Sequence, residues 1–170
     1  WFDFEFYKEI LEFSVQKGTK AIKLNYINEP LIRNDLIKFI DFAKKIGVLD
    51  IYFSTNGLLL NEQISEKLIN SGLTRIQISI DATTQETYDK IRPGGDYNKI
   101  IKNVLNFINL KKKLNSNLPL VRVNFVKTEF NHKELNDFLI LWKDKVDMIG
   151  IQEFVKPTKV KKNITGKREI

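Results

Sequence analysis

Short runs of apolar residues alternate along the chain with longer stretches in which apolar residues recur every three or four positions. The short runs predict β-strands, and the periodic stretches predict amphipathic α-helices. Since strand and helix alternate, the chain is expected to form βα units that feed one parallel sheet, an α/β fold. Strands are expected over 21–26, 51–54, 75–80, 120–126 and 148–154, and helices over 4–15, 35–46, 61–70, 97–114 and 133–143.

Turn-forming residues separate these elements. Asn34 is a candidate N-cap for the second helix, and Gly47 follows the last turn of that helix. Thr83 or Thr84 is expected to cap a short helical turn that ends at the Arg-Pro-Gly-Gly sequence of 92–95. In parallel βα folds, functional groups gather at the carboxyl ends of the strands and in the loops that follow them. The loops after the strands are therefore the places to look for chemistry.

Composition excludes several classes of protein. With 170 residues, 42% of them hydrophobic and 11% aromatic, the chain is long and apolar enough to bury the core of one domain, so it is not a disordered protein. No apolar run approaches the roughly 18 to 20 residues that a membrane-spanning helix needs. The absence of cysteine excludes disulfides, cysteine nucleophiles and thiolate-held metals within this sequence.

The formal charge of +7 arises from a lysine-rich composition, and no motif that combines aromatic and basic residues accompanies it. We therefore expect neither nucleic acid nor a membrane as a partner. No targeting segment is visible, so a cytoplasmic location is expected. Six of the fifteen residues in 156–170 are Lys or Arg, and this segment is expected to be a basic linker or tail after a core domain over 1–155.

Polar side chains concentrate where the predicted strands end. Such a set suits a small polar ligand with amine, hydroxyl and carboxylate groups, because a carboxylate accepts from an ammonium group and a guanidinium fork clamps a carboxylate. The candidates are Asn28, Glu29 and Pro30 after the first strand, Ser54, Thr55 and Asn56 at the second, Ser79 and Asp81 at the third, Arg92 beyond it, Arg122 and Asn124 on the fourth, and Gln152 and Glu153 on the fifth.

Several of these side chains also have a purely structural interpretation. Glu29 could be a solvated loop residue, and Asp81 is well placed to cap the helical turn that follows it. Arg92 could pair with Asp89 or Asp96 at the surface. The joint placement of the candidates at successive strand ends favours the binding interpretation.

Other chemistries find less support in the sequence. His132 is the only histidine and lies at a predicted helix start, so a surface or capping role is expected, and a histidine-based metal site is not. No glycine-rich phosphate loop is present. A hydrolase that uses Glu29 and Asp81 as paired carboxylates stays open as a weaker alternative.

Five stretches, taken in order, resemble the radical S-adenosylmethionine (radical SAM) enzyme family, in the branch that often carries a C-terminal SPASM-type domain for auxiliary iron–sulfur clusters. Each motif is weak alone, but five in this order at these intervals are fairly specific. The stretches are IKLNYINEPL (22–31), STNGLLL (54–60), ISIDA (78–82), YDKIRPGG (88–95) and VRVNFV (121–126).

The resemblance implies a fold, a cofactor and a site. The fold is a partial (β/α)6 TIM-like barrel in which this chain supplies strands two to six, the first strand and the cluster loop being absent. The cofactor is S-adenosylmethionine at the carboxyl rim. Within the site, Asn28-Glu29-Pro30 matches the motif that meets the methionine amine. Ser54, Thr55 and Asn56 match the strand end near the ribose and methionine, Ser79 and Arg92 match the pair that holds the methionine carboxylate and ribose, and Asn124 and Gln152 lie on strands that flank the adenosine.

One departure from the family is large. The family holds a 4Fe–4S cluster with three cysteines of a CxxxCxxC loop, and that cluster donates the electron that splits S-adenosylmethionine into methionine and a 5′-deoxyadenosyl radical. This sequence has no cysteine. We expect the cluster ligands to lie upstream of residue 1, in a longer protein, and this fragment alone to be inactive.

The expected function is thus that of a radical SAM enzyme whose complete form starts radical chemistry on an unknown substrate, such as a peptide, protein or sugar. The alternative is a non-catalytic, degenerate barrel that binds a nucleoside-like ligand or a protein partner. The sequence upstream of Trp1 distinguishes the two, because only the enzyme needs the three cysteines.

Overall fold

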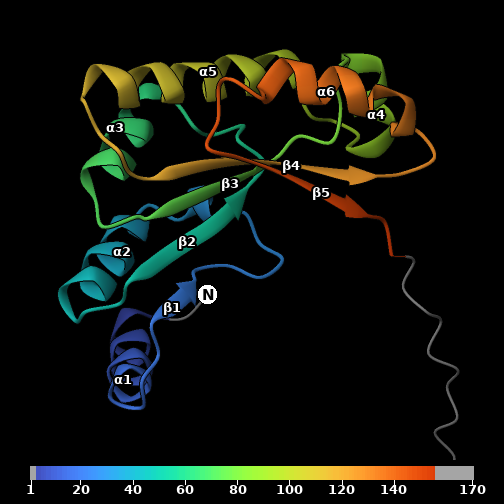
Figure 1. The fold of residues 1–170 in the computed structure, drawn as a ribbon. Helices are drawn as coiled ribbons and strands as arrows, with labels where there is room; N and C mark the ends of the chain where they lie inside the picture. Colours follow the sequence, from blue (N-terminus) through green and yellow to red (C-terminus); the bar gives the residue numbers. More distant parts are fainter. Residues whose placement is uncertain (1–2, 156–170) are drawn as a thin grey trace, which may run out of the picture.

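Five parallel strands form a single sheet in the computed structural model, which describes residues 3–155 (Figure 1). The strand order in the sheet is the order along the chain, so each strand lies beside the one before it. The strands are β1 (Ala21–Lys23), β2 (Asp50–Thr55), β3 (Arg75–Ser79), β4 (Leu120–Lys127) and β5 (Met148–Glu153). This arrangement confirms the predicted α/β class, and five sequential parallel strands fit a partial barrel.

A helix follows or precedes every strand, as the apolar periodicity predicts. The α-helices are α1 (Phe4–Gln16), α2 (Leu36–Lys45), α3 (Glu62–Asn70), α4 (Gln85–Ile91), α5 (Tyr97–Lys113) and α6 (Leu135–Trp142), with short 3₁₀ turns η1 (Pro30–Ile32) and η2 (His132–Glu134). Figure 1 shows that these helices all lie along one side of the curved sheet, to its left and above it, while the other side carries none.

The core lies between the sheet and these helices. Alternate residues of β2, β3 and β4 point into it and are buried, among them Phe53 on β2, Ile78 on β3 and Phe125 on β4. From the helices, Ile40, Phe107 and Trp142 fill the same layer. Because a helix layer covers only one face of the sheet, the intervening residues of each strand form a second, polar face, called here the open face.

Several element bounds shift by one or two residues from the sequence-based expectation, and two differences, at β1 and α2, have a clear side-chain cause. The first strand ends at Lys23 and not at Tyr26, because the side-chain amide of Asn25 takes over the pairing with β2: its Oδ1 accepts from Ser54 N at 2.9 Å and its Nδ2 donates to Ser54 O at 3.0 Å. The N-cap of α2 is Asp35 and not Asn34, and its side chain makes no capping bond because it pairs with Arg33.

None of the helices described within residues 3–155 is long and apolar enough to cross a bilayer. The expected basic linker over 156–170 lies outside the described residues.

Candidate functional site

The open face carries two rows of polar residues that are in register on neighbouring strands. Ser54, Gln77 and Arg122 occupy one row on β2, β3 and β4. Ser79 and Asn124 occupy the next row toward the carboxyl ends. Residues in register on parallel strands point to the same face. Three of the predicted site residues, Ser54, Ser79 and Asn124, are therefore gathered on the open face at the carboxyl end of the sheet.

The loop after β1 is folded against the carboxyl end of β2. The amide Nδ2 of Asn25, besides its bond to β2, donates to the carbonyl of Asn28 at 3.0 Å. The Asn28 side chain turns back, and its Oδ1 accepts from Tyr26 N at 3.4 Å. Tyr26 and Ile27 are 87% and 90% exposed. The loop thus presents its backbone and two apolar side chains at the rim next to Ser54.

Glu29 connects this loop to β2. Its Oε1 accepts from Thr55 Oγ1 at 2.7 Å and from Leu31 N at 3.1 Å, and its Oε2 accepts from Asn56 N at 2.8 Å. Thr55 is 3% exposed and points to the helix side of the sheet. The carboxylate expected to receive an ammonium group therefore has partners from the chain on both oxygens. Glu29 fixes the relative position of the β1 loop and the end of β2.

Arg92 pairs with Asp81, and not with Asp89 or Asp96 as the surface interpretation holds. The guanidinium Nε lies 3.0 Å and Nη2 lies 2.6 Å from Asp81 Oδ2. Asp81 does not cap the following helix, because Thr84 does so: its side chain accepts from Thr87 N. The Asp81 carboxylate instead reaches β4, where Oδ1 accepts from Val126 N at 2.7 Å.

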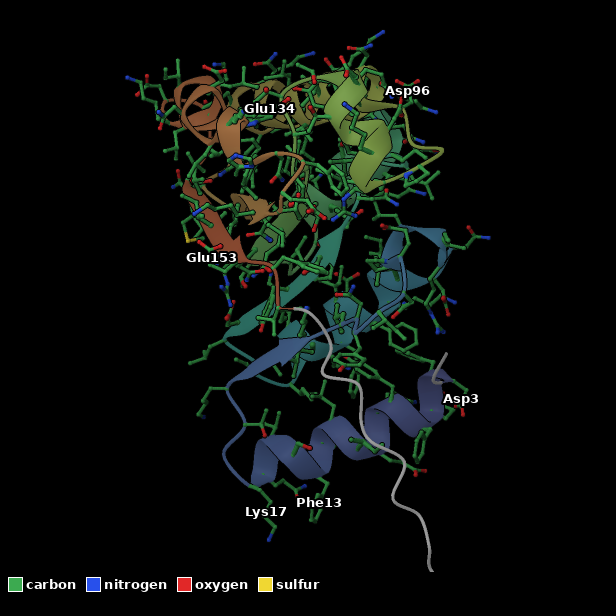
Figure 2. All side chains as sticks on the ribbon, turned by 90° about the vertical axis from the view of Figure 1, so that its right-hand side faces the viewer. Asp3, Phe13, Lys17, Asp96, Glu134 and Glu153 are labelled. Carbon is green, nitrogen blue, oxygen red and sulfur yellow. The ribbon has the colours of Figure 1, made fainter. Side chains whose placement is uncertain are left out.

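A second carboxylate, Glu134 of η2, secures the loop between β3 and α4. It accepts from Thr83 N at 2.6 Å, from Thr84 Oγ1 at 3.1 Å and from Thr87 Oγ1. Burial acts to raise the pKa of Glu134, but these hydrogen bonds outweigh it and hold the pKa below its usual value. No sequence pattern indicates this residue, since its partners lie about fifty positions away along the chain. Figure 2 labels Glu134 above the sheet and Glu153 at the end of β5.

Within the described residues, two of the three buried side-chain atoms that lack a hydrogen-bond partner lie on the open face. They are Arg122 Nε and Asn124 Oδ1, and the third is Trp142 Nε1 in the helix layer. Both open-face side chains lie over Gly150 of β5, where an added Cβ would clash with each of them. A buried acceptor without a donor is costly, so Asn124 Oδ1 fits a ligand that brings a hydroxyl or N–H group.

The remaining predicted residues take other positions. Pro30 is buried at the start of η1, where its fixed φ suits the first turn. Asn56 folds into a local turn, and its Oδ1 accepts from Leu58 N at 2.9 Å. Gln152 is exposed on β5, in register with Val126. Asn56 thus lies at the rim with its amide oxygen already bonded, and Gln152 lies on an edge strand.

Metal-binding side chains do not gather anywhere within residues 3–155: no group of three or more His, Asp or Glu residues is placed to hold a metal ion. The whole sequence contains no cysteine. The residues of this chain therefore do not provide ligands for an iron–sulfur cluster.

A scan against family models matches residues 5–127 to the Radical SAM superfamily. Among curated proteins, the chain is similar to the probable GTP 3′,8-cyclase of Methanocaldococcus jannaschii, with 34% identity over 146 residues, which cover 86% of this chain and 46% of the relative. The GTP 3′,8-cyclase of Alkaliphilus oremlandii is 34% identical over 139 residues, covering 81% of this chain and 41% of the relative. The chain thus spans somewhat less than half the length of these curated relatives.

Solved structures share the fold. The crystal structure of Streptococcus suis SuiB bound to S-adenosylmethionine matches 91% of this chain and 34% of SuiB, with a TM-score of 0.69 and 18% identity. Methylornithine synthase matches 90% of this chain and 44% of the synthase, with a TM-score of 0.66 and 16% identity. At these identities the likeness establishes the architecture alone.

Proposed function

Because this chain belongs to the radical SAM superfamily, we propose that the carboxyl end of its sheet binds S-adenosylmethionine, and that the complete protein cleaves this cofactor reductively to start radical chemistry. The family works with S-adenosylmethionine and a 4Fe–4S cluster, which supplies the electron for the cleavage. One observation carries the proposal for this chain: Asn124, in register with Ser79 on the open face, has a buried Oδ1 that no group of residues 3–155 bonds.

The proposed roles follow from the donors and acceptors that each side chain has available for a ligand. Arg92 uses Nε and Nη2 on Asp81, which leaves Nη1 to take a carboxylate oxygen. Asn124 Oδ1 accepts from a ribose hydroxyl, and the hydroxyl of Ser79 adds a donor beside it. The backbone around Asn28 lies at the rim next to Ser54 and is the proposed neighbour of the methionine amine.

Glu29 acts differently from the sequence-based expectation in this proposal. Both of its oxygens hold the end of β2 and the start of η1, so it supports the loop backbone that meets the cofactor. A carboxylate has lone pairs for further bonds, but both Glu29 oxygens are already bonded to the chain. The Thr55 hydroxyl and Leu31 N both donate to Glu29 Oε1. Thr55 therefore helps to hold the loop and does not face the cofactor.

The substrate of the complete protein is proposed to be a nucleotide. The similar curated proteins are named for action on GTP, which favours this class over the peptide, protein or sugar considered from the sequence. Arg122 agrees with a phosphate-bearing substrate, because its guanidinium lies on the open face and makes no ion pair within residues 3–155.

The experiment is to express the complete protein, reconstitute it anaerobically, add reductant and S-adenosylmethionine, and measure 5′-deoxyadenosine by liquid chromatography. Release of 5′-deoxyadenosine is expected, with faster release when GTP is added than when an unrelated peptide is added. The 170-residue chain alone should release none. Binding of S-adenosylmethionine without any cleavage by the complete protein would favour the non-catalytic module, and absence of binding would refute the proposal.

A further inference from the structure

We infer that Asp81 is the positioning residue that aims Arg92 at the carboxylate of the bound ligand, an inference that rests on the function proposed above. Asp81 lies two residues after the end of β3, is 2% exposed and has a φ of 61°. Most L-residues disfavour this left-handed backbone, whereas Asp and Asn tolerate it. The position therefore suits a short polar side chain, and of the two only Asp brings the negative charge that an arginine needs.

The Asp81 carboxylate is held in place by groups other than Arg92. Its Oδ1 accepts from Val126 N at 2.7 Å, at the carboxyl end of β4. The backbone carbonyl of Asp81 accepts from Asn131 Nδ2 at 2.8 Å, and Asn131 is itself fully buried. The same Nδ2 donates to the carbonyl of Val126 at 2.8 Å. The acid is thus tied to the ends of two strands.

Arg92 meets this fixed acid with one edge of its guanidinium only. Nε and Nη2 both approach Asp81 Oδ2, at 3.0 and 2.6 Å, while Nη1 makes no hydrogen bond to any residue of 3–155. The Arg92 side chain is 35% exposed. Its backbone N donates to Tyr88 O at 2.7 Å at the end of α4. The outer edge, Nη1 with the second hydrogen of Nη2, is the fork that a carboxylate binds through two bonds.

Holding the inner edge removes most of the rotamer freedom that a long arginine side chain would otherwise lose on binding. The chain engages both Asp81 oxygens, Oδ1 through Val126 N and Oδ2 through Arg92, and the buried side chain does not itself face a ligand. Its effect is therefore expected only on ligands that carry a carboxylate, which distinguishes positioning from general support of the fold.

The chain offers a matched control at the other end of β4. Asp147 also accepts from a β4 backbone N–H, that of Val121 at 2.7 Å, and also pairs with a cation, Lys111 at 3.1 Å. It lies at the amino end of β4, away from the proposed site. Removing its charge perturbs the strand and an ion pair without touching Arg92.

The experiment compares two probes, S-adenosylmethionine and its decarboxylated analogue, by anaerobic isothermal calorimetry on the complete protein and its Asp81→Asn and Asp147→Asn variants. Asp81→Asn is expected to weaken S-adenosylmethionine about tenfold, the size of one charge-assisted contact, and to change the affinity for the analogue less than about twofold. Asp147→Asn should leave both affinities unchanged. If Asp81→Asn does not fold, Asp81→Glu, which keeps the charge and displaces the guanidinium, takes its place with the same expectation.

The outcomes separate the inference from the proposed function. If the unmodified protein binds neither probe, the proposed function fails. If it binds S-adenosylmethionine but the Asp81 variant weakens both probes alike, or weakens neither, the inference is overturned while the proposed function stands.

Discussion

The two faces of the sheet differ in whether their side chains have polar groups available to bind a ligand. On the helix side, Phe53, Ile78 and Phe125 are fully buried in an apolar layer with no capacity for a ligand. On the open face, Asn124 Oδ1 has no partner within residues 3–155, and Arg92, at the rim, has a guanidinium edge that no residue of this range bonds. Neighbouring residues in one strand therefore have different roles. Helix-side residues should control the stability of the fold, and open-face residues should control binding.

The largest effect should come from Phe53→Ala. This ring is fully buried between β2 and the helices, and its loss is expected to cost about 3–5 kcal/mol of unfolding free energy. Ser54→Ala, one residue further on and on the open face, removes a 3.2 Å bond to Gln77 and should cost below about 1 kcal/mol. Chemical denaturation of both variants checks the contrast, which equal losses would contradict.

Glu29→Ala should behave as a stability variant although it lies in a motif assigned to the cofactor. The change leaves Asn56 N and the Thr55 hydroxyl without their acceptor, and a loss of about 2–3 kcal/mol in unfolding free energy is expected. Glu12→Ala, an exposed acid on α1, is the control and should change stability by less than about 0.5 kcal/mol. A Glu29 variant as stable as the control would show that the hydrogen bonds of Glu29 do not stabilise the fold.

Arg92→Lys should weaken binding with little loss of stability. Lysine can still pair with Asp81, but it presents a point charge in place of a fork, so the affinity for S-adenosylmethionine is expected to fall about tenfold. Arg75→Lys is the control, because Arg75 also forms an acid pair on the open face but at the amino end of the sheet. Equal losses of affinity in the two variants would remove the distinction between the ends of the open face.

The smallest effect should come from Asp50→Asn, at that amino end. Hydrogen bonds from Arg75, opposed by burial and aided by Thr74, hold the pKa of Asp50 below the usual 3.8. A lowered native pKa means that the pair stabilises the fold fully above about pH 3.8 and that this contribution is lost as pH falls through the lower native value. Unfolding free energies should differ by below about 1 kcal/mol near pH 6, and the difference should shrink as the pH falls below the native pKa of Asp50. A difference that does not change with pH would contradict this account.

The sequence predicted the elements well because apolar periodicity records burial against the helices. Its errors arose where side chains replace backbone. The apolar alternation of Leu24 and Tyr26 continues past Lys23, yet the strand ends there because Asn25 pairs with β2 through its amide. Backbone propensities do not indicate that a side-chain amide will take the place of backbone pairing.

The contacts of the candidate residues were harder to predict than their placement at the strand ends. The structure places Ser54, Ser79 and Asn124 together at the carboxyl end of the open face, as their positions at strand ends predict. The expected partners of Arg92, in contrast, were Asp89 and Asp96, its near neighbours along the chain. Arg92 pairs with Asp81 instead, because α4 brings Arg92 back to the end of β3. Glu134 went unnoticed for the same reason, since the fold alone brings it to Thr83.

The most direct test of the central claim is a crystal structure of the complete protein grown anaerobically with S-adenosylmethionine. The account predicts the methionine carboxylate on the outer edge of Arg92 and a ribose hydroxyl within hydrogen-bond distance of Asn124 Oδ1. Cofactor density elsewhere, with both of these groups still without a ligand, would contradict it.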